Sequence, residues 1–246
     1  MRRFNRKWLL VIPVILVIAV AGFVVWAETA AAPMPEALAA LQSDANVTVK
    51  TDGLLEFIPT DESSAVGLIF YPGAKVDPRA YAPMAHALAQ QGFRVEIPSM
   101  TLNLAIFSIN AADPIIAAHP EIKHWAIGGH SLGGSMAARY VQASPQKVEG
   151  LLFLASYPDI DLSSLPLKVT VIYGSLDGLA TVEKVESTRP LLPSATQWVK
   201  IEGGDHAQMG WYGAQAGDNA ASISREDQQK QVIDASAALL NSLKAA

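Results

Sequence analysis

The sequence predicts a three-layer α/β domain with a mostly parallel sheet of about eight strands, preceded by a helix that crosses a membrane. Short apolar runs alternate with helical patterns from residue 47 onward, which indicates a parallel sheet covered by helices on both faces. One of these runs leads through a Gly-x-Ser-x-Gly turn into an Ala-rich helix. At the N-terminus, a basic cluster precedes 20 uncharged residues, which is typical of membrane insertion.

The N-terminal segment predicts a retained membrane anchor. Residues 8–27 are uncharged, and a helix of this length extends about 30 Å, enough to cross the hydrocarbon core. The basic end is expected on the cytoplasmic side, so the rest of the chain would lie outside the cytoplasm. The basic residues are Arg2, Arg3, Arg6 and Lys7.

The alternative is a cleaved signal peptide, which would make the domain a secreted one. Small residues at 19–21 or 30–32 would form the cleavage site, but the length of the apolar run favours an anchor. The chain is accordingly divided into an anchor or signal segment (1–27), a linker with a short helix (28–46) and one folded domain (47–246).

The composition limits the number of domains and the kinds of partner. With 246 residues and 50% hydrophobic content, the chain can bury one large core. It has no cysteine, so it has neither a disulfide nor a thiolate metal site. Beyond residue 7, 14 Lys and Arg stand against 23 Asp and Glu, a net charge of −9, which argues against nucleic acid as a partner.

The expected strands are short apolar runs bounded by turn residues. The first two are joined around Thr51-Asp52-Gly53, which predicts a β-hairpin. The later runs suit buried parallel strands, with helices between them. The expected strands are 47–50, 54–59, 65–71, 93–98, 123–128, 148–155, 167–173 and 196–202, and the expected helices are 78–91, 114–118, 132–142, 179–189 and 227–244.

Ser131 is the expected nucleophile. It lies in Gly129-His130-Ser131-Leu132-Gly133, between an apolar strand and a helix. A strained strand-to-helix turn holds a serine hydroxyl clear of its own backbone, where a base can activate it. The bare pattern arises by chance in about one chain in ten of this length, so the prediction depends on the strand and helix around it.

An activated serine needs a histidine as its base, and His206 is the expected one. It follows the last expected strand in a Gly-rich loop, at the carboxyl edge of the sheet, where the turn around Ser131 also lies. The other four histidines are expected to be packed or on the surface. His130 should point away from the serine, because neighbouring side chains alternate along a strand. The remaining three are His86, His119 and His124.

Asp177 is the expected acid that orients His206. It follows a strongly apolar strand at the same edge of the sheet, and the order Ser131, Asp177, His206 is the one expected for a nucleophile elbow on such a sheet. Asp159, which follows the preceding strand, remains an alternative. Asp205 is geometrically awkward as a partner for the histidine beside it.

Two backbone N–H groups are expected to stabilise the oxyanion. One belongs to Leu132, directly after the nucleophile, and the other to Ala74, in the loop after an earlier strand. Gly73 would let this loop approach the substrate closely, and Tyr71 and Lys75 are candidate substrate contacts. Tyr-Pro-Gly by itself is also an ordinary turn, so this role depends on its place after an apolar strand.

The site is expected to be an open cleft. Only residues 156–166 separate two of the expected strands, too few for a helical cap. Residues 100–107 and the loop after His206, with Met209 and Trp211, are expected either to line the cleft or to pack against the core. Neither segment has the convergent charges that a phosphate or a sugar acid would need.

These residues together resemble the α/β-hydrolase superfamily, and the resemblance covers nearly all of residues 47–246. The turn around Ser131 is similar to that of lipases and esterases, and Tyr71-Pro72-Gly73 occupies the place of the family's His-Gly oxyanion loop. Asp177 and His206 match the family's acid and base. More narrowly, the chain is similar to small lid-less members related to dienelactone hydrolases, which have a cysteine where this chain has a serine.

The resemblance implies a serine hydrolase that cleaves a small-molecule, uncharged ester and needs no metal or organic cofactor, and the N-terminal segment predicts that this enzyme is anchored to a membrane. In the expected reaction, the histidine takes the serine proton, the serine attacks the carbonyl carbon, two amides stabilise the oxyanion and water releases the acyl group. Two alternatives stay open. One is a serine peptidase or acyltransferase with the same triad, and the other is a membrane-tethered binding protein that keeps the fold without catalysis.

Overall fold

The computed structural model describes residues 8–61 and 65–244. Its strands are β1 (Val47–Lys50), β2 (Leu54–Pro59), β3 (Val66–Tyr71), β4 (Arg94–Pro98), β5 (His124–His130), β6 (Gly150–Leu154), β7 (Lys168–Gly174) and β8 (Gln197–Ile201). They form one sheet in the order β1-β2-β4-β3-β5-β6-β7-β8. The first two strands form the expected antiparallel hairpin, β2 also pairs antiparallel with β4, and all other neighbours are parallel. The prediction of a mostly parallel eight-stranded sheet is therefore confirmed.

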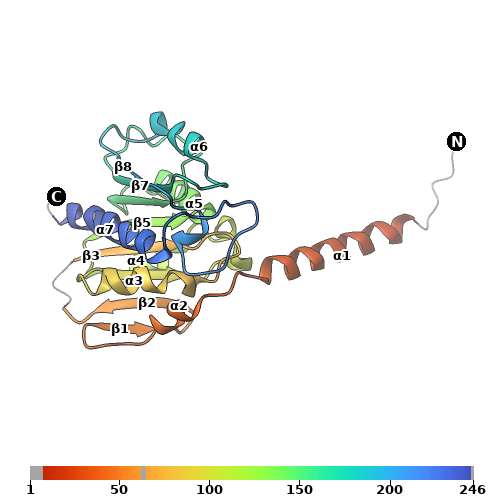
Figure 1. Ribbon diagram of the computed structural model, residues 1–246. Coiled ribbons are helices and arrows are strands. Elements are labelled where there is room, and N and C mark those ends of the chain that lie inside the picture. The colour runs from red at the N-terminus through yellow and green to blue at the C-terminus, as the bar shows by residue number, and fades with distance from the viewer. Residues whose placement is uncertain (1–7, 62–64, 245–246) are drawn as a thin grey trace.

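Helices cover both faces of this sheet. The helices of the domain are α2 (Pro35–Ala39), α3 (Ala82–Ala89), α4 (Ala112–Ala118), α5 (Leu132–Ala143), α6 (Val182–Glu186) and α7 (Arg225–Leu243), with 3-10 turns η1 (Pro78–Tyr81), η2 (Thr101–Asn103), η3 (Ala105–Phe107), η4 (Arg189–Leu191) and η5 (Ala207–Met209). A further helix, α1 (Trp8–Glu28), extends away from the sheet (Figure 1). α3 and α7 contact each other in front of the sheet, whereas α5 lies behind it against β5 and β6 (Figure 1). No helix lies between β6 and β7, all of whose connecting residues are described, so the expected absence of a cap is confirmed.

One expected helix is shorter than its sequence pattern suggests. The prediction covered residues 179–189, but α6 begins only at Val182. The Asp177 carboxylate accepts hydrogen bonds from the backbone N–H groups of Leu179 and Ala180, at 2.8 and 2.7 Å. These two amides are held in a loop by that carboxylate, so the helix starts after them.

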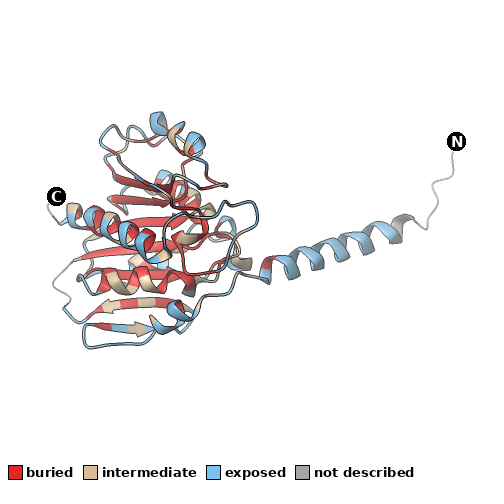
Figure 2. Cartoon of the chain, viewed as in Figure 1, coloured by how far each residue is buried: buried red, intermediate tan, exposed pale blue. Residues whose placement is uncertain are grey.

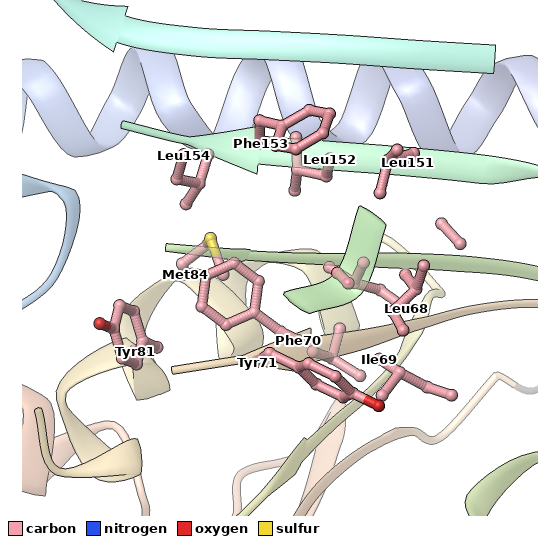
Figure 3. Close-up of a cluster of buried hydrophobic side chains, with 14 of the residues drawn as sticks. Leu68, Ile69, Phe70, Tyr71, Tyr81, Met84, Leu151, Leu152, Phe153 and Leu154 are labelled. Atoms are coloured by element: carbon pink, nitrogen blue, oxygen red, sulfur yellow. The ribbon is translucent and has the colours of Figure 1, made fainter. Parts of the chain in front are cut away.

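The central strands are buried along their whole length. Every residue of β3 and β6 is buried, and such continuous apolar runs suit strands that have helices on both faces. Figure 3 shows Leu68 and Phe70 of β3, Leu152 and Phe153 of β6 and Met84 of α3 in one hydrophobic cluster. This packed core fixes the strand ends from which the candidate site projects.

The N-terminal helix leaves the domain as a single rod (Figure 1). Its residues are exposed over nearly all of the described length, and burial begins only at its C-terminal end, at Ala27 (Figure 2). The stretch Val11–Glu28 has a mean hydropathy of 2.5 and is long and apolar enough to span a membrane, a property that signal sequences share. The basic residues at positions 2–7 lie outside the described residues.

The segment after this helix is attached to the domain at two points. Ala31 pairs with Val76 in a parallel β-bridge, and Pro33 pairs with Tyr212 in an antiparallel one. The short helix expected in this segment is α2. The predicted linker with a short helix is therefore held against the domain by backbone hydrogen bonds.

Candidate active site

Ser131 occupies a sharp turn between β5 and α5. Its backbone has φ +52° and ψ −123°, a strained conformation for a residue with a side chain. The turn packs closely on the end of β3, because a Cβ atom on Gly133 would lie 2.2 Å from the carbonyl oxygen of Tyr71. Any side chain at position 133 would push the loop after β3 away from the serine.

His206 and Asp177 meet at the carboxyl edge of the sheet. The Nδ1 atom of His206 lies 2.9 Å from Oδ2 of Asp177, and both side chains are buried. The other carboxylate oxygen is engaged by the two backbone N–H groups described above, so the carboxylate has a fixed orientation. The Nε2 atom of His206 is buried and has no hydrogen-bond partner among the described residues. This nitrogen is available to accept a proton.

Asp218 holds together the two loops that carry this pair. One of its carboxylate oxygens accepts hydrogen bonds from the backbone N–H groups of His206 and Ala207, at 3.0 and 2.9 Å. The other accepts from Gly178 and Asn219, both at 2.9 Å. Asp218 was not predicted to belong to the site, because its only signal in the sequence is a place in a Gly-Asp-Asn turn far from the expected strands.

Replacing Asp218 with alanine is expected to lower both stability and turnover. Several backbone N–H groups would lose their acceptor, which costs about 1–3 kcal/mol for a buried donor. A displaced His206 would lower kcat about 10- to 100-fold, since misplacement by about 1 Å has an effect of that size. Urea unfolding and ester hydrolysis measure the two effects. Asp161→Ala is the matched control, because the Asp161 carboxylate accepts a hydrogen bond from an exposed backbone N–H. Equal unfolding midpoints and equal turnover for the two variants would contradict the prediction.

A buried hydrogen-bond chain links the loop after β3 to the residue before the serine. The Gly73 N–H donates to the Tyr81 hydroxyl at 3.0 Å, and this hydroxyl lies 2.8 Å from Nδ1 of His130. Burial, with the nearby His206, holds the pKa of His130 well below its ordinary value, so the ring is neutral. The tautomer of the ring decides whether Nδ1 or the Tyr81 hydroxyl donates in this hydrogen bond. A Cβ atom on Gly73 would lie 2.6 Å from the same Nδ1, so glycine is required there by close approach.

His130 also supports the candidate base. Its ring centroid lies 4.5 Å from that of His206. A charged ring in this place would oppose protonation of His206, whereas the neutral ring does not. The expectation that His130 is a packed residue agrees with its complete burial. Its contact with the base and the part played by Tyr81 were not predicted, since Tyr81 lies within a helical pattern and carries no sequence signal for this role.

Replacing Tyr81 with phenylalanine is expected to destabilise the fold by about 1–3 kcal/mol, because the Gly73 N–H and the His130 nitrogen would both stay buried without a partner. The denaturant midpoint measures this loss. Tyr157→Phe serves as the control, because the Tyr157 hydroxyl makes no hydrogen bond among the described residues. Equal midpoints for the two variants would show that the chain of hydrogen bonds has no such role.

Two backbone N–H groups beside the serine are free. Those of Leu132 and Ala74 donate to no acceptor within the described part of the chain. Lys75, the next residue of the loop, has a positive φ of 56° and donates its N–H to the Asn103 carbonyl at 2.8 Å. The loop is therefore held from its far side while the Ala74 amide remains unpaired.

The other side chains predicted to contact the substrate are buried. The Tyr71 side chain is buried, and its hydroxyl donates to the Ile109 carbonyl and accepts from the Ala112 N–H. In Figure 3 the hydroxyls of Tyr71 and Tyr81 point in opposite directions. Met209 is completely buried, and Trp211 is 8% exposed. The candidate substrate contact in residues 71–75 is therefore the main chain, since the predicted side-chain contacts are buried or engaged.

The alternative acid and the remaining histidines lie in other surroundings. Asp159 forms an ion pair with Arg139 on the surface. His86, His119 and His124 bind the carboxylates of Asp44, Glu121 and Glu149, respectively.

Among the described residues, one group has the composition of a cation site. Ligand atoms of Glu56, Glu96 and His119 lie within 4.8 Å of one another. The Arg94 guanidinium already binds both carboxylates at 2.5 Å and supplies the positive charge there. Burial raises the pKa of Glu96 to about 7, which further weakens it as a metal ligand at neutral pH.

Comparison with known proteins assigns the chain to a family. Residues 67–230 match the alpha/beta hydrolase family, and this match covers more than half of the chain. The protein therefore belongs to the alpha/beta hydrolase family and is a hydrolase-type enzyme. Among solved structures, the esterase domain of a Rhodothermus marinus protein is similar, with a TM-score of 0.58, 14% identity and coverage of 75% of this chain and 90% of that chain. At this identity the likeness shows the fold. No curated protein matches the sequence significantly.

Proposed function

We propose that the protein is a carboxylic ester hydrolase with Ser131 as nucleophile, His206 as base and Asp177 as the acid that orients the base. The observation that carries the proposal is the buried 2.9 Å hydrogen bond between His206 Nδ1 and the Asp177 carboxylate. It fixes the tautomer of the ring, because Nδ1 donates its proton to the carboxylate and Nε2 is left to accept one.

In the proposed reaction, Nε2 of His206 takes the proton of the Ser131 hydroxyl as its oxygen attacks the ester carbonyl carbon. The N–H groups of Leu132 and Ala74 stabilise the resulting oxyanion. The protonated His206 then gives its proton to the leaving alcohol. Water, activated by the same histidine, attacks the acyl-enzyme, releases the carboxylic acid and restores the serine.

The substrate is proposed to be an uncharged ester. The domain has no cap, so an ester with a long acyl chain meets no helical barrier above the serine. The fold is shared with an esterase domain, which supports ester chemistry over the peptidase alternative. Lys75 is the one cationic residue in the 71–75 loop, and its ammonium group lies 4.2 Å from the centre of the Trp26 ring. Because this contact engages the ammonium group, the loop does not offer it to a negatively charged substrate.

A panel of p-nitrophenyl esters and aminoacyl p-nitroanilides tests this function with the full-length protein. We expect hydrolysis of the esters and at least about 100-fold weaker hydrolysis of the anilides, since residues 71–75 contain no carboxylate that could bind the amino group. Faster cleavage of the anilides would establish a peptidase instead. Failure to cleave either, without covalent capture of the serine, would support the non-catalytic alternative.

We also propose that α1 is retained as an anchor, with the domain outside the cytoplasm. The contacts of Ala27 and the Ala31–Val76 bridge support retention, because cleavage near residues 30–32 would remove or disrupt both. The intact mass of protein purified from membranes tests retention, and protease treatment of spheroplasts tests the side. A mature protein beginning after residue 21 would contradict the anchor.

A further inference from the structure

The end of the apolar helix is packed directly on the loop beside the serine. The Asn103 side-chain amide donates to the Ala27 carbonyl at 3.1 Å, and Lys75 lies over the Trp26 ring. The Ala31 N–H donates to the Lys75 carbonyl, and the Ala31 carbonyl accepts from the Asp77 N–H at 3.1 Å. Ala31 is four residues beyond Ala27, a span of at most about 14 Å. The loop that carries the Ala74 amide therefore lies at the membrane-proximal end of the domain if α1 crosses a bilayer.

An exposed apolar lip continues from the helix onto the domain. Ile106 and Phe107 in η3 are 51% and 53% exposed. The Phe107 ring packs edge-on against Phe23 of α1, with centroids 6.4 Å apart, and Trp26 is itself 52% exposed. We call Phe23, Trp26, Ile106 and Phe107 the apolar lip. Large apolar side chains that continue the surface of a membrane helix are stabilised by lying in the same interface.

The backbone beneath the lip is held in an unusual conformation. Lys75, Leu102 and Asn103 all have positive φ angles, from 53° to 56°. A strained backbone conformation persists only where surrounding contacts hold it in place. Here the holding contacts are those between the 71–75 loop, the lip and the end of the helix. The 71–75 loop, the lip and the end of the membrane helix are thus joined by direct contacts.

Resting on the proposed ester hydrolysis and on the retained anchor, we propose that the enzyme acts on acyl esters lodged in the bilayer that holds α1. The lip dips into the interface of that bilayer, and the acyl chain of the substrate passes over it to the serine. The domain is acidic, and the two cations of residues 71–79 are engaged, Lys75 over the Trp26 ring and Arg79 with Asp77, so the membrane surface that the lip meets is zwitterionic or uncharged.

Fluorescence quenching tests where the lip lies. Because the chain has no cysteine, Phe107→Cys gives a single site for an environment-sensitive fluorophore in the full-length protein. In phosphatidylcholine vesicles containing lipid with a quencher on its acyl chain, the probe at 107 should be quenched. Gln146→Cys, exposed after α5 at the opposite edge of the sheet, is the matched control and should not be. An unquenched probe at position 107 overturns the proposal. This includes the outcome in which a second copy of the chain covers the lip and shields the probe from the lipid.

Separating the domain from the helix tests the substrate class. Twenty Gly and Ser residues inserted between Glu28 and Thr29 leave the Ala31 bridge in place but move the domain by about 25 Å on average. We expect hydrolysis of a water-soluble acetyl ester to be unchanged, and hydrolysis of a palmitoyl ester in phosphatidylcholine vesicles to fall about 10-fold or more. An unchanged ratio of the two rates overturns this inference alone. If the wild-type protein cleaves neither ester, the proposed function itself fails.

Discussion

Ser131→Ala is expected to lower kcat/KM for a p-nitrophenyl ester by about 10⁴- to 10⁶-fold, the range found when the nucleophile of a serine triad is removed. The alanine keeps the backbone of the turn but provides no oxygen to form the acyl-enzyme. Residual hydrolysis would come from the Leu132 and Ala74 amides, which still stabilise attack by water.

The control for this substitution is Ser144→Ala, at the far end of α5. The Ser144 hydroxyl makes no hydrogen bond among the described residues, so its removal should change neither stability nor turnover. Circular dichroism and the unfolding midpoint should be alike for both variants and the wild type. A Ser131→Ala enzyme within about 10-fold of the wild type would exclude this serine as the nucleophile.

His206→Ala is expected to have an effect of similar size, because the serine hydroxyl then has no base and the leaving alcohol has no acid. Residues that act as one unit are strongly non-additive. The double variant Ser131→Ala/His206→Ala should therefore be no slower than the slower single variant. Steady-state kinetics on one ester at one pH measure all three.

His124→Ala is the matched control for this second substitution. His124 begins β5 at the opposite edge of the sheet and binds the half-exposed Glu149. Its loss should leave turnover within about twofold. A double variant whose loss equals the product of the single losses would mean that Ser131 and His206 act independently, which contradicts a triad.

Much of the fold follows from local patterns in the sequence. The hairpin around Gly53 and the continuous apolar strands are set by turn chemistry and burial, and the observed strand bounds lie close to the expected ones. The helix predicted over 179–189 is shorter because a local contact, the Asp177 carboxylate with the two backbone amides that follow it, competes with helical propensity. The apolar pattern of the helix does not show that an aspartate side chain takes up these amides.

The contact between Asp177 and His206 was also predictable, since both residues follow a strand and parallel strands bring such positions to one edge. The residues that support them were not. Asp218 and Tyr81 act through backbone N–H groups and a neighbouring ring, and two of these partners, His206 for Asp218 and His130 for Tyr81, lie 12 and 49 positions away along the chain. Bonds of this kind depend on how loops fold over one another, which periodicity does not encode.

The most direct test of the central claim is covalent capture of Ser131 by a fluorophosphonate. Intact-mass measurement of the native full-length protein should show one adduct per chain, and peptide mapping should locate it on Ser131. The heat-denatured protein and the His206→Ala variant should remain unmodified, because the hydroxyl reacts only when the folded site activates it. A native protein that takes up no label, or one labelled at another residue, would contradict the account.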